Sequence, residues 1–379
     1  MRQAAAYDRL DAAFIRLDTR LDTPEHGPQA RPPAGIIVDV TRMRALLAGY
    51  PELAAVLAAA VLGLTAQRPL AWLAARQGIN VLLAVLTFAT AVTIEPAALR
   101  AAASAWRSLL AALAAGITVL PALSWVVSRM VAAGPLRDGV MTVGLAPCEI
   151  ASVATTAMAG GEAALSAGVL IGSAAAAVLA AGPILRAEAG HAGFSPGGII
   201  VSLALVVALP LTAGIAARTR VPLTAGALST ARAERAAAVT ALCAVAALVA
   251  LIAAEVHLSA GYAVVAGALA VFLLCSALVG RLLGARTRAA AATALLLTTS
   301  MRDFAIAAGL ATAAFGPAAA APLGLYGILV LAWGTAAAGL LRRSPLRRSP
   351  PGNRERSGLP RGRQGFSDLS AHPVNPFIG

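Results

Sequence analysis

Long apolar stretches, separated by short groups of Arg, Pro and Gly, run through the chain from residue 45 to residue 341. The hydrocarbon core of a bilayer is about 30 Å thick, and a helix needs roughly 20 apolar residues to cross it. The pattern therefore predicts an all-α membrane protein with about ten transmembrane helices. Their expected ranges are 47–66, 78–98, 106–130, 139–160, 164–186, 197–217, 238–256, 260–283, 289–314 and 319–341.

The composition supports a membrane protein and excludes the soluble classes. Of the 379 residues, 59% are hydrophobic and only 12% are charged, whereas soluble domains carry about 25% charged residues. The sequence pI is about 11.3. The Arg residues that cause it lie in the tails and between the apolar runs, so we expect no nucleic-acid partner. The three Cys and four His residues have no metal-ligand spacing, and we expect no metal cofactor.

All 30 basic residues are Arg, and their distribution predicts the orientation of the chain. Short cytoplasmic loops of membrane proteins are enriched in Lys and Arg. If the N-terminus is cytoplasmic, 24 Arg residues fall on the cytoplasmic side and 5 on the opposite side, with Arg302 inside a span. We therefore expect a multi-pass protein of the cell membrane with both termini in the cytoplasm.

Two polar tails flank the apolar region. Residues 1–44 lack the apolar stretch that directly follows the charged start of a signal peptide, so we interpret them as a cytosolic tail. Residues 342–379 are rich in Arg, Pro, Ser and Gly, a composition that is typical of disorder. The membrane domain is accordingly expected at residues 45–341.

The fourth and ninth predicted spans are each interrupted by polar residues near their middle. The interrupted stretches read GLAPCEIASVATT and TTSMRDFAIAA, and a short Gly-containing turn leads from each to the next apolar run. They lie five helices apart. Two successive repeats with an odd number of helices each cross the membrane in opposite orientations. The pattern is therefore typical of a transporter with inverted repeats and broken central helices.

Ionisable residues deep inside a span are costly and mostly functional, and three are the clearest cases here. Glu149 follows the helix-breaking Pro147 in the fourth span, and Arg302 and Asp303 follow the hydroxyl cluster 298–300 in the ninth. A buried ion pair between Glu149 and Arg302 that only joins two helices is the alternative to a functional site.

An isolated Arg at the membrane midplane favours an anionic ligand, because its guanidinium binds a carboxylate or sulfonate with two hydrogen bonds. We therefore predict a substrate site formed by Arg302 with Asp303, Cys148 and Thr299. For Cys148, packing as a small apolar side chain is an equally good interpretation.

The segment APCEIASVATTAMAGGEAALSAGVLIGS resembles the fourth and fifth helices of the bile acid:sodium symporter family. SMRDFAIAAGLATAAFGPAAAAP resembles its ninth helix, which usually has Gln and Asn in place of Arg302 and Asp303. The similarity spans about residues 45–341. It implies ten helices in two inverted five-helix repeats, with helices four and nine crossing at their breaks. The implied panel domain comprises residues 45–103 and 195–258, and the implied core domain comprises residues 104–190 and 259–341.

The same resemblance implies sodium ligands that this chain keeps only in part. Ser152 and Ser166 match hydroxyl ligands of the family. Two neutral hydroxyls are too few for a strong sodium site, so we expect proton coupling or sodium-independent transport rather than symport with two sodium ions. Glu149, Ser152, Ser166 and Thr298 are the predicted ion-coupling residues. The family ligands that are replaced correspond to Val153, Leu170 and Thr298.

The fourth span also resembles that of the related arsenite efflux permeases. Their Cys in this helix aligns with Cys148, and their Gly-Asp pair aligns with Gly161 and Glu162. Because arsenite is thiophilic, export of such an oxyanion through Cys148 is the second hypothesis. A sensor or a membrane-embedded enzyme is a third hypothesis, which no Ser-His pair, acidic dyad or output domain supports.

The leading prediction is a secondary active transporter of small organic anions that works by alternating access and is not an enzyme. Its expected partners are a small anionic solute and the lipid bilayer. No cofactor is expected beyond a coupling sodium ion or proton.

Overall fold

A computed structural model describes residues 51–94, 96–189, 195–220, 227–254, 256 and 261–343. The regular elements of these residues are all helices, and their only extended pairing is one isolated bridge. The described helices all belong to one compact unit, which begins at Pro51. The predictions for the N-terminal tail and for residues 344–379 lie outside the described residues.

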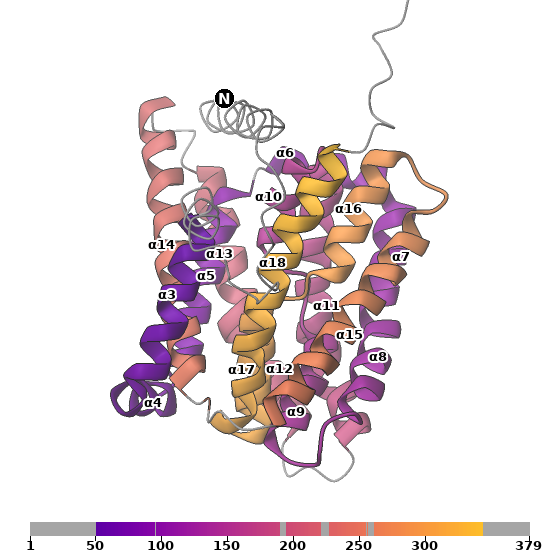
Figure 1. Cartoon of the computed structure of the whole chain (residues 1–379). Coiled ribbons are helices and arrows are strands. Elements are labelled where there is room, and N and C mark those ends of the chain that lie inside the picture. Colours follow the sequence, from indigo (N-terminus) through magenta and orange to yellow (C-terminus); the bar gives the residue numbers. More distant parts are fainter. Residues whose placement is uncertain are drawn as a thin grey trace, which may run out of the picture. The chain divides into compact units, whose positions relative to one another are not determined.

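The described helices include part or all of each predicted apolar segment, while the helix Gln67–Ala75 and most of the helix Pro96–Ser104 lie outside those segments (Figure 1). In the first half they are α3 (Pro51–Thr65), α4 (Gln67–Ala75), α5 (Gly78–Thr93), α6 (Pro96–Ser104), α7 (Trp106–Ile117), α8 (Val119–Ser128), α9 (Pro135–Thr142), the 3-10 turn η1 (Val143–Leu145), α10 (Ala151–Met158) and α11 (Ala163–Ala189). In the second half they are α12 (Pro196–Leu203), the π-helical turn η2 (Ala204–Ala208), α13 (Leu209–Arg220), α14 (Ala227–Ala254), α15 (Gly261–Gly284), α16 (Ala289–Ser300), α17 (Phe304–Phe315), the 3-10 turn η4 (Pro317–Ala320) and α18 (Ala321–Arg343).

Six helical stretches in the described residues are long and apolar enough to cross a membrane. They confirm a multi-pass, α-helical membrane protein. The other predicted segments do not form one continuous span each: α5 has 16 residues, and segments four and nine are interrupted in the middle. The six stretches are Trp106–Ser128, Ala163–Ala189, Pro196–Arg220, Arg235–Ala254, Gly261–Gly284 and Pro317–Arg342.

The first apolar segment is followed by a short helix that the sequence pattern does not predict. Leu57–Thr65 and Gln67–Ala74 are bent by 100° relative to each other. At the end of α4 the Arg76 guanidinium lies over the Trp72 ring, 4.3 Å from its centroid, and Trp72 is 58% exposed. A Trp beside a cation at a helix bend is typical of the membrane–water interface, where Trp side chains are enriched.

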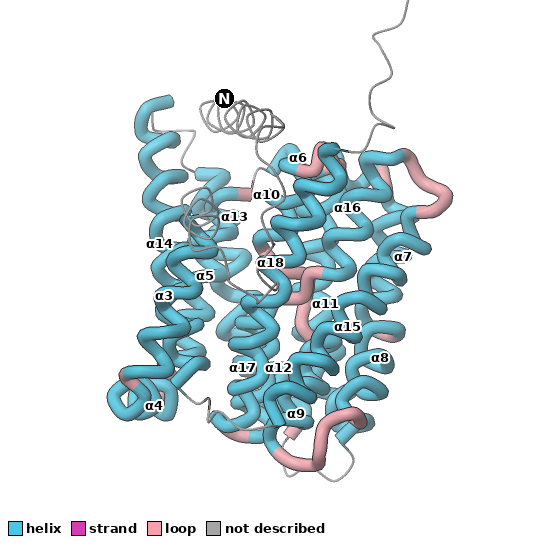
Figure 2. The backbone as a smooth tube through the Cα atoms, viewed as in Figure 1, coloured by secondary structure: helices cyan, strands magenta, loops and turns pink. Residues whose placement is uncertain are grey.

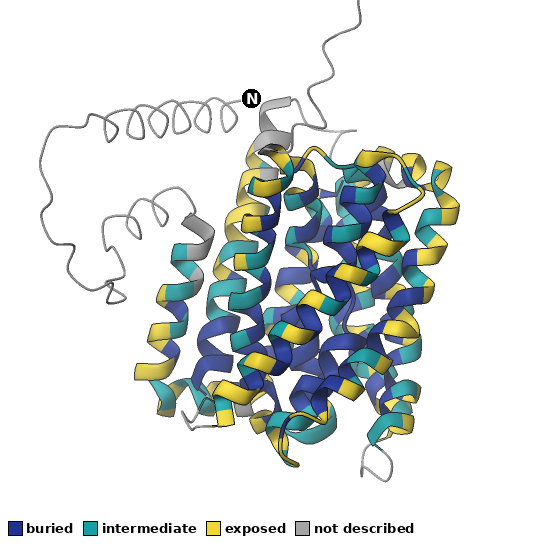
Figure 3. Ribbon diagram, turned by 45° about the vertical axis from the view of Figure 1, so that its right-hand side comes forward, coloured by how far each residue is buried: buried dark blue, intermediate teal, exposed yellow. Residues whose placement is uncertain are grey.

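Small residues allow neighbouring helices to approach closely. A Cβ atom at Gly63 of α3 would lie 2.4 Å from the Ala250 carbonyl oxygen of α14, and one at Gly144 of η1 would lie 2.2 Å from the Leu120 carbonyl oxygen of α8. Lipid supplies no hydrophobic force between helices, so such backbone contact provides much of the packing. Large apolar side chains such as Leu179 and Leu340 are instead exposed, and Figure 3 shows exposed positions along the outer sides of the helices.

Two sets of helices pack closely among themselves. In one set α14 packs on α3 and α5, and α13 packs on α5. In the other, α15 packs on α16 and α8, and α11 packs on α6, α7 and α10. The division into a panel domain and a core domain that move separately stays a prediction.

Candidate functional site

Two helix breaks meet in the middle of the bundle. The first comprises residues 146–150, between η1 and α10, and the second comprises residues 301–303, between α16 and α17. Pro147 explains the first break, because its ring removes a backbone donor and clashes with the preceding turn. Figure 2 shows both breaks as loop segments halfway along the helices.

The two breaks form a short antiparallel backbone pairing. Cys148 and Arg302 form a bridge. The Glu149 N–H donates to the Met301 carbonyl at 2.8 Å, and the Asp303 N–H donates to the Pro147 carbonyl at 2.9 Å. Each break thus satisfies backbone groups that the other has freed, which is the condition for non-helical backbone at membrane depth.

This pairing places the charged side chains on two opposite faces. Side chains alternate between the faces of an extended segment, and directly paired residues share a face. Cys148 and Arg302 therefore project from one face of the crossing, and Glu149 and Asp303 from the other. Two pockets agree with this geometry, since Arg302 lines the first and Asp303 lines the second.

We name the pockets by the helices beside them. Both are narrow: the first, the α7–α11 pocket, has a cavity volume of about 10 Å³ and the second, the α5 pocket, of about 20 Å³, which is room for about one water molecule. The residues that line the α7–α11 pocket include Leu113, Gly116, Pro121, Ser173, Ala177 and Arg302. Those that line the α5 pocket include Thr87, Thr90, Ile150, Leu170, Val207 and Asp303.

Arg302 is only 3% exposed and has spare hydrogen-bonding capacity. One terminal nitrogen of its guanidinium donates to the Ala146 carbonyl at the end of η1, while Nε has no partner. The backbone N–H of Arg302 faces the Tyr326 hydroxyl at 3.3 Å. The carbonyl end of a broken helix carries partial negative charge, so the guanidinium is well placed there and retains a free donor.

Asp303 begins α17 as its N-cap residue. Its Oδ1 atom accepts hydrogen bonds from the backbone N–H groups of Ala305 and Ile306, both at 2.9 Å. The other oxygen, Oδ2, is buried and has no partner. The side chain therefore stabilises the helix start and leaves one negatively charged oxygen beside the α5 pocket.

Glu149 is also buried, at 6% exposure, and its Oε2 atom has no partner. Among the described residues, no ion pair joins Glu149 to Arg302. The charged neighbour that acts on Glu149 is Asp303, a second carboxylate. The alternative in which Glu149 and Arg302 only lock two helices together is therefore wrong for this structure, because the pairing register directs the two side chains away from each other.

Cys148 is completely buried. Its backbone N–H donates to the Ser173 hydroxyl at 3.0 Å, and the Ser152 hydroxyl lies 3.8 Å from its sulfur. The structure thus places Cys148 beside Arg302 and Ser152 beside Cys148, and it encloses the thiol in packed side chains.

The other predicted residues are buried close to the crossing without forming one cluster. The Thr298 hydroxyl donates to the Ala294 carbonyl of its own helix at 2.8 Å. Ser166 receives a hydrogen bond from Thr156 at 3.4 Å, and Thr299 is 3% exposed. The structure brings Arg302, Asp303, Glu149 and Cys148 together, whereas Ser166 lies beside α10.

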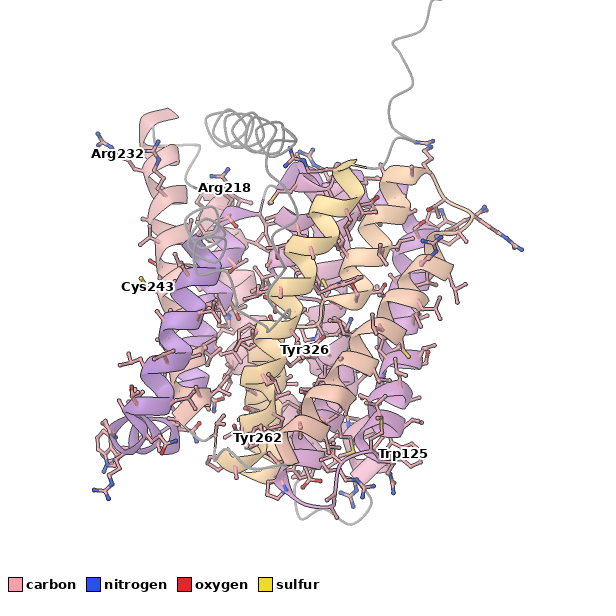
Figure 4. All side chains as sticks on the ribbon, in the orientation of Figure 1. Trp125, Arg218, Arg232, Cys243, Tyr262 and Tyr326 are labelled. Atoms are coloured by element: carbon pink, nitrogen blue, oxygen red, sulfur yellow. The ribbon has the colours of Figure 1, made fainter. Side chains whose placement is uncertain are left out.

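Three further residues hold the crossing in place, and sequence reasoning did not assign them to it. The Tyr326 hydroxyl of α18, labelled in Figure 4, lies 3.4 Å from the Ser300 carbonyl. Trp333 donates to the Ser300 hydroxyl at 2.9 Å, and Ser173 accepts from Cys148. In the sequence these residues stand out only as isolated polar or aromatic residues in apolar helices. The same pattern is equally typical of residues that anchor a helix at the membrane–water interface.

Comparison with known proteins agrees with this architecture. Residues 80–266 match the model of the Sodium Bile acid symporter family, which confirms the family resemblance of the sequence. The matched region contains the first helix break and lies before the second. No curated protein matches the chain. Members of the family are transporters, so the match and the apolar helices together indicate a membrane transporter of the bile acid:sodium symporter type.

Proposed function

We propose that this protein is a secondary active transporter of small organic anions, and that it works by alternating access. The observation that carries the proposal is Arg302, a buried guanidinium with an unpartnered Nε atom at the crossing of two broken helices. A buried charge is costly unless it is paired. An anionic solute would supply the missing partner, and charges at membrane depth commonly mark the path of a substrate.

The proposed architecture is ten helices in two inverted five-helix repeats. The antiparallel pairing of the breaks supports it, because equivalent segments of inverted repeats approach each other in opposite directions. Alternating access would then be a rocking of the set with α3, α5, α13 and α14 against the set with the crossing. The α5 pocket lies between the two sets.

The proposed coupling is to protons, or transport is independent of sodium. Glu149, Ser152, Ser166 and Thr298 remain the proposed ion-coupling residues. The Thr298 hydroxyl donates a hydrogen bond to a carbonyl of its own helix. This supports the view that Thr298 does not act as an ion ligand in place of the family residue that it replaces. Glu149 keeps one oxygen free to take up a cation.

The proposed substrate residues are Arg302, Asp303, Cys148 and Thr299. In this arrangement Arg302 attracts the anion, and Asp303 keeps the start of α17 fixed beside it. Cys148, which pairs with Arg302, and Thr299 are both buried and would contribute shape. The cell membrane as location and the cytoplasmic placement of both termini belong to the same proposal.

Uptake into proteoliposomes tests the function. Taurocholate, pyruvate and an alkyl sulfonate serve as labelled probes with wild-type protein and with Arg302→Gln. We expect uptake of at least one probe, reduced about 100-fold or more by the substitution, because hydrogen bonds between charged groups are the strong ones. Arg107→Gln, the same change at a residue whose guanidinium lies over Trp106, is the matched control. Unchanged uptake by Arg302→Gln would overturn the assignment.

Export of a thiophilic oxyanion through Cys148 is not favoured, because the thiol is enclosed. Arsenite resistance of cells that express wild-type protein or Cys148→Ser distinguishes this hypothesis. We expect both to match cells without the protein.

A further inference from the structure

Three ionisable side chains are buried at the crossing, and their charges do not balance. Arg302 is 3% exposed, Asp303 1% and Glu149 6%. Among the residues that the structure describes, these are the buried side chains that ordinarily carry a charge. One guanidinium and two carboxylates leave a net charge of −1 in surroundings of low dielectric constant. An uncompensated buried charge is costly, and such a site is usually neutralised.

The helices around the crossing supply no further charge that would correct the balance. The described helices α5, α10, α16 and α17 contain no ionisable side chain. In α11 and α18 the charged residues lie in the last turn, away from the crossing. The other titratable groups at the crossing are Cys148, on the opposite face of the pairing, and Tyr326, whose hydroxyl faces the Ser300 carbonyl. Both types of side chain are ordinarily neutral near neutral pH.

The register of the pairing brings the two carboxyl groups close together. Because Cys148 is opposite Arg302, Glu149 and Asp303 are diagonal neighbours on one face of an antiparallel pair. Diagonal neighbours lie about 7–8 Å apart or less, within reach of long side chains. The Glu149 carboxyl also interacts with the backbone N–H of Phe304, the first residue of α17, and with the charge of Asp303. It therefore reaches the helix start that Asp303 caps.

One oxygen of each carboxyl group lacks a hydrogen-bond partner. These atoms are Oε2 of Glu149 and Oδ2 of Asp303, and both are buried. Two ionised carboxylates offer acceptors only, so they cannot satisfy each other. A single proton removes this conflict, because a protonated carboxyl group has one O–H donor, which the free oxygen of the other group can accept.

We propose that Glu149 and Asp303 bind one proton as a pair, so that the crossing is electrically neutral together with Arg302. The proton comes from bulk water, forms an O–H bond with one carboxylate and is hydrogen-bonded by the other. The inference rests on the proposed proton coupling in one respect, since it names the site and the number of the protons. It differs in giving Asp303 a part in proton binding and in requiring none of the three hydroxyl residues proposed there.

Infrared spectroscopy of the purified full-length protein tests the site without any transport. A protonated carboxyl group has a C=O stretching band that an ionised carboxylate lacks, and difference spectra between variant and wild type remove the contributions of other carboxyl groups. We expect the band in the wild-type protein at neutral pH and its loss in Glu149→Gln. Glu162→Gln makes the same change at a half-buried residue between α10 and α11 and is expected to keep the band.

Asp303→Asn distinguishes a shared proton from a proton that Glu149 holds alone. Asn is as good an N-cap as Asp, so α17 should keep its start while one negative charge is lost. Glu149 would then balance Arg302 as an ionised carboxylate. We therefore expect the band to disappear although the Glu149 carboxyl is intact. Arg302→Gln changes the balance in the opposite direction, and we expect the band to increase because both carboxyl groups would be protonated.

Each other result overturns the proposal in a distinct way. Absence of the band from the wild type, or its persistence in Glu149→Gln, shows that the pair holds no proton. Its persistence in Asp303→Asn shows that Glu149 is protonated without its partner and refutes the sharing. The expected band pattern without any response of uptake to a pH gradient would support the site and refute the proposed coupling. Uptake that responds to pH in a protein without the band would support the coupling and refute the site.

Discussion

The Asp303 cap of α17 gives the sharpest quantitative test of the crossing. Asp303→Ala removes the acceptor of two buried backbone N–H groups, those of Ala305 and Ile306. A buried donor without a partner costs about 1–2 kcal/mol here, so we expect the free energy of unfolding to fall by about 2–4 kcal/mol. Asp303→Asn keeps an oxygen in the same position, and Asn is as good an N-cap as Asp.

Equilibrium unfolding in mixed detergent measures the stability, and hydrogen exchange followed by mass spectrometry measures the cap itself. We expect faster exchange of the peptide that contains Ala305 and Ile306 in the Ala variant and near-wild-type exchange in the Asn variant. If both variants exchange equally fast, the negative charge near Arg302, and not the cap, stabilises the break. If neither changes, the geometry of Asp303 described above is wrong.

Three further predictions concern coupling, accessibility and packing. Uptake into proteoliposomes should respond to an imposed pH gradient without sodium, and Glu149→Gln should remove this response; strict sodium dependence would contradict the proposed coupling. In mild detergent, N-ethylmaleimide should modify the exposed Cys243 but not the buried Cys148, which mass spectrometry can distinguish. Gly144→Ala should destabilise the protein by about 1–3 kcal/mol through overpacking against α8, as thermal unfolding would show, whereas Gly267→Ala should have little effect.

The helix breaks could be predicted from the sequence because their causes are local. Pro147 cannot continue a helix, and Arg302 with Asp303 interrupts an apolar run. The six long helical stretches likewise follow from the apolar pattern alone. These features depend on neighbouring residues, which the sequence displays directly.

The charge separation at the crossing could not be predicted in the same way. It depends on the register in which Cys148 meets Arg302, and a shift of one residue would exchange the two faces. The ion pair between Glu149 and Arg302 was a reasonable alternative only while that register was unknown. The closeness of Gly116 to the Arg302 guanidinium, where a Cβ atom would lie 3.8 Å from both terminal nitrogens, could not be predicted either, because only the packed structure brings α7 there.

The mutual pairing of the breaks also has a consequence for biosynthesis. The first break is synthesised long before the second, since Ala146 and its partner Arg302 are 156 positions apart. Until α16 and α17 are inserted, the Glu149 amide and the Pro147 carbonyl have no partner from the second break. Unsatisfied backbone groups cost several kcal/mol each in hydrocarbon. The first five predicted spans should therefore be unstable in the bilayer without the rest of the chain. A nascent chain that ends before residue 289 should remain a substrate for membrane quality-control proteases.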